Sequence, residues 1–142
     1  MRALLDVNFL IALTDPGHSF RQTAIAWLTD RFDYGWASCP LTQNGCVRIV
    51  NQPKYPFRVS ISEASSTLHD ICASPHHVFW PDDISLLDPQ LFDHSKIHSP
   101  KQLTDLYLLG LAVKNQGRLV TFDYSIPISA VRGAKAEHLV VL

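Results

Sequence analysis

The sequence predicts an α/β protein, a three-layer α/β/α sandwich built around a central parallel sheet. Short apolar segments alternate along the chain with longer segments that have helical periodicity. The apolar segments are too uniformly hydrophobic for strands with one face in water, which favours a sheet covered by helices on both faces. Functional groups in such sheets gather at the carboxyl ends of the strands.

The first half of the chain supplies two expected strands and the helices that follow them. The apolar triplet Ala3–Leu5 is the first strand, and the amphipathic pattern of residues 19–32 predicts a helix that Ser19 can cap. Pro40 ends the second strand, and Thr42 is expected to cap the next helix. The elements expected in this half are strands at 3–5 and 36–39, and helices at 7–13, 19–32, 42–51 and 60–73.

The second half contains the most hydrophobic helix of the chain. Residues 101–116 are apolar almost all round, which is typical of a buried helix, and Gly117 is expected just past its end. Ser60 or Ser62 is expected to cap the preceding helix, with Glu63 in its first turn. The other elements expected are strands at 78–80, 118–122 and 138–142, a short helix at 82–91, and a polar loop at 93–100.

Composition limits the classes of function. The 142 residues favour a single domain over 1–142, and a net charge of −1 argues against a dedicated DNA-binding protein. Three cysteines form no CxxC pair, which suggests a reducing compartment. Asp6 interrupts the first apolar run too early for an export signal, and no run approaches the roughly 20 residues of a membrane span. We therefore expect a cytoplasmic protein with no membrane partner.

Three aspartates stand out because of their positions. Asp6 follows the strand ALL and Asp123 follows LVTF, so both are expected at the carboxyl edge of the sheet. Asp105 lies in the first turn of the buried helix, on one face with Leu108 and Leu109. Each also has a structural interpretation, because Asp6 and Asp105 can cap helices and Asp123 can begin a turn.

Three converging carboxylates favour a divalent metal site. Mg²⁺ prefers carboxylate oxygens, and such a site can activate water and neutralise a phosphodiester. A haloacid-dehalogenase-like phosphatase would need a second aspartate where Asn8 stands, and the segment after VFW is a poor match to a receiver domain. The pair His94 and His98 lies in a polar loop and, with no cysteine pair nearby, gives little support for zinc.

Three segments in this order resemble the signature segments of PIN domains, most closely the VapC-type toxins of toxin–antitoxin pairs. They are LLDVNFLIAL, TDLYLLGLAV and GRLVTFDYSI, and CPLTQNGCVRIV and HSFRQTAIAWL also fit. The resemblance implies a PIN-like fold, Mg²⁺- or Mn²⁺-dependent endoribonuclease activity on RNA, inhibition by a cognate antitoxin, and a homodimer.

The resemblance also implies roles for individual residues. Asp6, Asp105 and Asp123 match the acids, of which the first two are the most direct metal ligands. The supporting residues it implies are Asn8, Gln43, Thr104 and Thr121. Family members usually have Glu at the position of Gln43, and an amide carries no charge and cannot act as a base. A PIN-like module that binds RNA or a protein without cleaving RNA therefore remains an alternative.

Overall fold

Five parallel strands form the central sheet of the computed structural model, which describes all 142 residues. The strands follow the order β3-β2-β1-β4-β5 across the sheet. Their bounds are β1 Ala3–Leu5, β2 Trp36–Ser38, β3 His77–Phe79, β4 Arg118–Thr121 and β5 Leu139–Val141. The expected parallel sheet is confirmed, and the strands differ from the predicted ones only at their ends.

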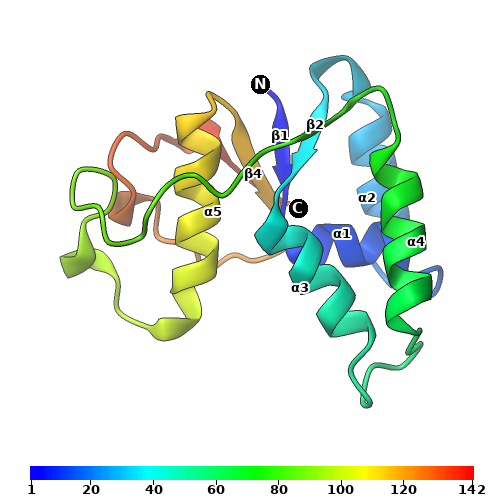
Figure 1. Ribbon diagram of the computed structural model, residues 1–142. Coiled ribbons are helices and arrows are strands. Elements are labelled where there is room, and N and C mark those ends of the chain that lie inside the picture. Colours follow the sequence, from blue (N-terminus) through cyan, green and yellow to red (C-terminus); the bar gives the residue numbers. More distant parts are fainter.

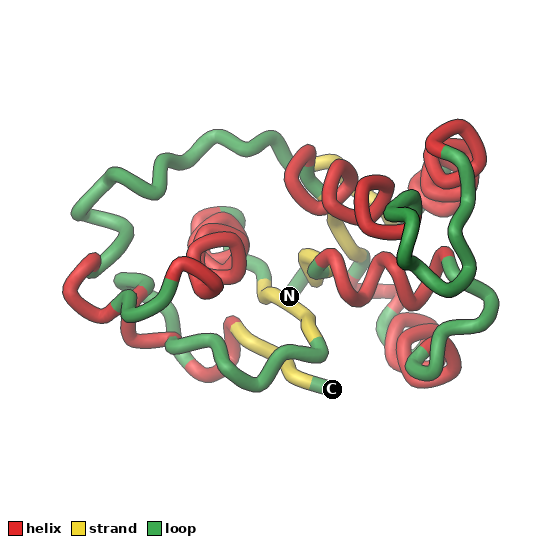
Figure 2. Tube along the Cα trace, turned by 90° about the horizontal axis from the view of Figure 1, so that it is seen from below, coloured by secondary structure: helices red, strands yellow, loops and turns green.

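Helices cover both faces of the sheet, as the sequence predicts (Figures 1 and 2). In Figure 1, α5 lies on one side of β1 and β4, and α2 and α4 lie on the other. The helices are α1 Val7–Thr14, α2 Arg21–Thr29, α3 Pro40–Val50, α4 Ile61–Cys72 and α5 Leu103–Lys114. Short 3₁₀ helices join them at Phe32–Tyr34, His94–Lys96, Pro100–Gln102, Ile128–Ala130 and Ala136–His138.

Strand β1 separates two hydrophobic clusters. Ala3 and Leu5 belong to the cluster formed with α1 to α4, whereas Leu4 belongs to the cluster formed with α5 and the loops beside it. Successive side chains of a strand point to opposite faces, so a strand with every residue buried must have apolar neighbours on both sides. This explains why β1 lacks the polar alternation of a half-exposed strand.

Four local predictions are corrected by the structure. Residues 82–91 form turns instead of a helix, because Pro81, Pro89 and the polar residues between them favour turns. Ser19 does not cap α2, whose N-cap is Phe20 without a side-chain hydrogen bond. The other two lie at helix ends: Pro40 rather than Thr42 begins α3, and Gln116 rather than Gly117 adopts the left-handed conformation after α5, at φ 57°.

The order of the strands places the expected functional edge between β1 and β4. The chain adds β2 and β3 on one side of β1, and β4 and β5 on the other, so the winding direction reverses there. Ligands of open parallel sheets bind at the carboxyl ends of strands at such a reversal. Asp6 follows β1 and Asp123 lies two residues after the end of β4, so the edge carries an acid on each side of the reversal.

Candidate functional site

Asp6 connects the end of β1 to the start of α1. Its Oδ1 accepts a hydrogen bond of 2.7 Å from the Val7 backbone N–H, which makes it the N-cap of α1. The residue is only 4% exposed, and burial raises its pKa. The structural and functional interpretations of Asp6 are therefore compatible, because the cap fixes the carboxylate at the sheet edge.

Thr121 joins Asp6 to the neighbouring strand. Its hydroxyl donates a 2.7 Å hydrogen bond to Oδ2 of Asp6 and accepts one of 3.1 Å from the side-chain amide of Asn8. The same hydroxyl accepts a 3.0 Å hydrogen bond from the backbone N–H of Asp123. Since residues from β1, α1 and β4 meet in this network, the orientation of the Asp6 carboxylate is determined by three elements.

Asp123 begins a turn after β4 and remains partly exposed. Its Oδ1 accepts hydrogen bonds from the Ser125 backbone N–H at 2.8 Å and from the Ser125 hydroxyl at 2.7 Å. The Ser125 hydroxyl is the main cause of the lowered pKa of Asp123, because it stabilises the ionised form. Sequence reasoning did not identify Ser125, although a serine two residues after an aspartate is a known turn signal.

Asp105 lies in the first turn of α5, half-buried and facing the other two acids. Burial, followed by the charges of Asp6 and Asp123, raises the pKa of Asp105 to about 7. The nearby Asp123 carboxylate contributes to that rise, and Asp105 in turn lowers the pKa of Asp123. The Asp105 and Asp123 carboxyl groups therefore interact electrostatically at the sheet edge.

The three acids have no cationic partner. No Lys, Arg or His side chain forms a salt bridge with any of them. No group of three or more His, Cys, Asp or Glu side chains in the structure is arranged so that it could hold a metal ion together. Mg²⁺ commonly takes one or two carboxylates and keeps several waters, so the residue types and uncompensated charge at this edge fit such an ion.

Two predicted supporting residues lie outside this network. The side-chain amide of Gln43 donates a 2.9 Å hydrogen bond to the hydroxyl of Ser38, which also lies 2.8 Å from Nε2 of His77. Gln43 lines a cavity of about 300 Å³ between α3 and α4, and no hydrogen bond joins it to the aspartates. Thr104 is exposed on α5, and its side chain forms no hydrogen bond within the protein.

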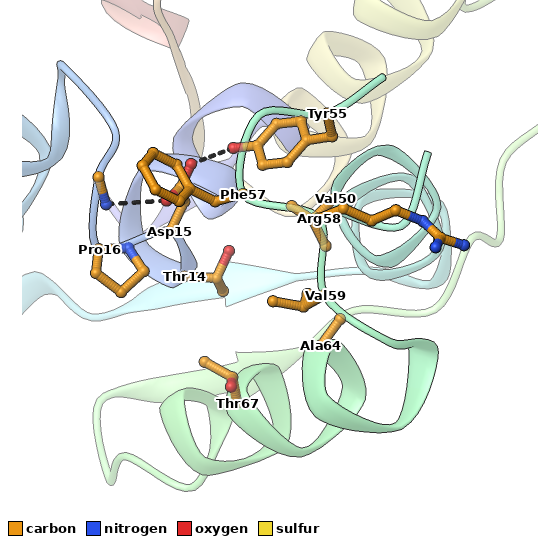
Figure 3. Close-up of a pocket in the computed structure, with 11 residues that line it drawn as sticks. Thr14, Asp15, Pro16, Val50, Tyr55, Phe57, Arg58, Val59, Ala64 and Thr67 are labelled. Carbon is orange, nitrogen blue, oxygen red and sulfur yellow. Dashed lines mark hydrogen bonds between the residues drawn. The ribbon is translucent and has the colours of Figure 1, made fainter. Parts of the chain in front are cut away.

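A more enclosed cavity lies away from the acidic edge. It has a volume of about 360 Å³ between the end of α1, the loop after α3 and the start of α4 (Figure 3). Asp15 lies in its wall and accepts hydrogen bonds from Tyr55 and from the backbone N–H of Gly17. None of the three aspartates lines this cavity, so the enclosed cavity and the acidic residues lie in different places. We take the acidic edge as the candidate site because function is argued from the chemistry of the residues present.

Several curated proteins are similar to the chain over most of its length. Ribonuclease VapC44 of Mycobacterium tuberculosis is 50% identical over 142 residues, which cover 100% of both chains. Ribonuclease VapC39 of the same organism is 38% identical over 134 residues, covering 94% of this chain and 96% of that protein. No family model matches the chain.

Two solved structures are similar in fold. The VapBC2 complex of Rickettsia felis, bound to a DNA fragment from its promoter, aligns with a TM-score of 0.59 and 14% identity over 87% of this chain and 89% of that chain. VapC20 of Mycobacterium tuberculosis, described as a toxin that cleaves the sarcin-ricin loop, aligns with a TM-score of 0.56 and 12% identity over the same shares. No helix of the present chain combines the length and hydrophobicity required to cross a membrane.

Proposed function

The chain belongs to the VapC ribonucleases, toxins with a PIN-like α/β/α fold, and on that premise we propose that it is a metal-dependent endoribonuclease. It hydrolyses phosphodiester bonds of RNA at the edge formed by Asp6, Asp105 and Asp123. The observation that carries this proposal is the meeting of three carboxylates at the β1/β4 reversal with no basic side chain to neutralise them.

Asp6 and Asp105 are the residues that would hold Mg²⁺ or Mn²⁺, with Asp123 binding directly or through water. The bound ion would supply positive charge for the scissile phosphate and lower the pKa of an attacking water. Thr121 and Asn8 orient the Asp6 carboxylate through the hydrogen bonds described above. Ser125 keeps Asp123 in its ionised form, in which the carboxylate can accept a proton or a hydrogen bond.

The similarity in sequence and fold to VapC proteins supports further parts of the proposal. One solved relative is a VapBC complex, which supports a cognate antitoxin as the partner that inhibits this chain. We also propose a homodimer, a cytoplasmic location and a single domain over residues 1–142. A shift to a larger complex on mixing the purified chain with the product of a neighbouring small gene would support the antitoxin.

RNA cleavage by the purified protein tests the activity. In the presence of Mg²⁺ or Mn²⁺, Asp6→Ala is expected to lower the cleavage rate by at least about 100-fold, because a ligand and the cap of α1 are lost together. Asp6→Asn separates these effects, since an amide oxygen can still cap the helix. Asp70→Asn, which changes an exposed aspartate on α4, is the matched control and should cleave like wild type.

Two outcomes would contradict the catalytic assignment. Equal cleavage by wild type and Asp6→Ala would exclude the acidic edge as the reaction site. Binding of RNA without cleavage under any divalent ion would favour the non-catalytic PIN-like module, for which the neutral Gln43 is the supporting observation.

A further inference from the structure

Three phenylalanine rings form a continuous stack from the core to the surface. The rings of Phe9 and Phe122 are parallel within 8°, with centroids 5.5 Å apart. The ring of Phe20 stacks on Phe122 with centroids 4.8 Å apart and an angle of 20°. Phe9 is fully buried, whereas Phe20 is 48% exposed, so the stack ends in an aromatic ring that solvent can reach.

This stack adjoins the acidic edge. Phe122 lies between Thr121 and Asp123 in the chain, and its backbone N–H points to Oδ1 of Asn8 at 3.4 Å. Phe20 lies at the start of α2, where its backbone N–H donates a 3.1 Å hydrogen bond to Nδ1 of His18. The exposed ring of Phe20 therefore stacks on the ring of Phe122, which directly follows β4, the strand that leads to Asp123.

A rigid, uncharged ring that stacks on the residue before Asp123 suits one part of an RNA chain better than the others. A phosphate is repelled by the carboxylates unless a cation is present, whereas a neutral base experiences little of that repulsion. Every base has a π-face that can stack on an aromatic side chain, and bases are free to do so in single strands and loops. Stacking on an already stacked ring needs no movement of the core.

We propose that Phe20, supported by Phe122, is a stacking platform for an unpaired base of RNA next to the bond at the acidic edge. The proposal rests on the proposed function and assigns to Phe20 a contact that the proposed function does not include. Phe20 is then a substrate-binding residue, and Phe122 is a positioning residue that also fixes the course of the chain between Thr121 and Asp123.

Binding of a short unstructured RNA tests the platform in an Asp6→Asn background, which limits cleavage during the measurement. Phe20→Ala is expected to weaken binding about 5- to 150-fold, the range for loss of one base–aromatic stack. Phe20→Trp should bind at least as tightly as the parent, and Phe20→Leu should resemble Phe20→Ala. Tyr34→Ala is the control, because Tyr34 is 62% exposed but precedes β2 at the opposite edge of the sheet.

Two further readouts distinguish stacking from a general loss of structure. The dependence of affinity on salt should have the same slope in the parent and in Phe20→Ala, because stacking releases no counterions. A single abasic nucleotide, moved along the RNA, should weaken binding to the parent at one position and have little further effect on Phe20→Ala. Thermal unfolding of each variant shows whether the fold is retained.

The possible results separate this proposal from the proposed function. If wild type cleaves RNA but Phe20→Ala binds and cleaves it like the parent, the proposed role of Phe20 in stacking is contradicted. The proposed ribonuclease function is then unaffected. If Phe20→Ala instead changes only the oligomeric state or antitoxin binding, the ring is a protein contact and the RNA platform is again wrong. If wild type neither binds nor cleaves RNA, the proposed function fails and the platform fails with it.

Discussion

Burial and the neighbouring carboxylates of Asp6 and Asp123 raise the pKa of Asp105 to about 7, well above the ordinary value of 3.8. Between these two values the folded protein holds a proton that the unfolded chain has released. The stabilisation from that proton is therefore complete below about pH 4 and is lost as the pH rises through about 7. Without divalent ions, we expect wild type to lose stability over this range.

Asp105→Asn isolates this contribution, because asparagine does not titrate. Because Asp105 is half-exposed and solvent screens its charge, we expect wild type to lose only about 1–2 kcal/mol relative to the variant between pH 5 and pH 8. Urea unfolding of both proteins in EDTA measures the difference. Parallel curves of stability against pH would show that Asp105 ionises normally in the folded protein.

Gln43 is the second residue whose charge can be tested. Its amide donates a hydrogen bond to Ser38 rather than to an aspartate. Ser38 is the last residue of β2, so this contact still lies at the carboxyl end of the sheet, as the aspartates do. We expect Gln43→Glu to strengthen Mn²⁺ binding by about 2- to 5-fold, because it adds negative charge to this edge. Calorimetry with Mn²⁺ measures the effect. Unchanged affinity would assign Gln43 to the contact between β2 and α3 alone.

The sequence could predict which acids occupy the edge but not how they are held there. Asp6 and Asp123 were identifiable because each follows a short apolar strand, and parallel strands end at one edge. The hydrogen bond from Thr121 to Asp6 joins residues 115 positions apart, which no local pattern reveals. The stack of Phe20 on Phe122 was missed for the same reason, since it joins the residue before α2 to the residue after β4, 102 positions apart.

At the scale of elements, Gly110 determines how α5 packs. A Cβ atom at this position would lie 2.6 Å from Cζ of Phe92, which is fully buried and cannot easily move. Alanine normally favours a helix over glycine by about 1 kcal/mol, but the clash should outweigh this gain. We expect Gly110→Ala to destabilise the protein by about 1–3 kcal/mol and to slow RNA cleavage, because α5 carries Asp105.

A second substitution distinguishes the clash from other effects. Phe92→Leu removes the ring atoms that a Cβ at position 110 would meet. The double variant should therefore be more stable than the sum of the two single changes predicts, by about 1 kcal/mol. Chemical unfolding of the four proteins completes the cycle. Simple additivity would mean that α5 shifts to accommodate alanine without contact with residue 92.

The elements that the sequence predicted well are those with strong local signals. Ser60 caps α4 through a 3.1 Å hydrogen bond from the Glu63 backbone N–H, as the serine and the acid three residues later indicated. The expected helix at 82–91 is wrong because its apolar spacing competed with prolines and with residues that favour turns. In that region the chain instead covers α5, where Phe92 packs against it, a role set by tertiary contacts.

At the scale of the whole molecule, metal binding should be coupled to folding. The acids meet only when β1, β4 and α5 are assembled, so an ion bound at their edge stabilises the folded state over the unfolded chain. At pH 8 and a concentration of 100 times its Kd, Mn²⁺ is expected to add about 2.7 kcal/mol. EDTA should remove this gain, and Asp105→Asn should reduce it, whereas Asp70→Asn should retain it.

The coupling also changes the expected effect of pH, which makes the prediction specific to the acidic edge. A cation favours the ionised form of Asp105, so its affinity should increase as the pH rises through about 7. In EDTA the stability of the folded protein should decrease as the pH rises. With saturating Mn²⁺ the decrease should be smaller, or the stability should increase. Thermal unfolding at one protein concentration, with and without Mn²⁺ at pH 5, 7 and 8, measures this. If Mn²⁺ stabilises wild type equally at every pH, the ion binds elsewhere, because a site containing Asp105 must compete with its proton.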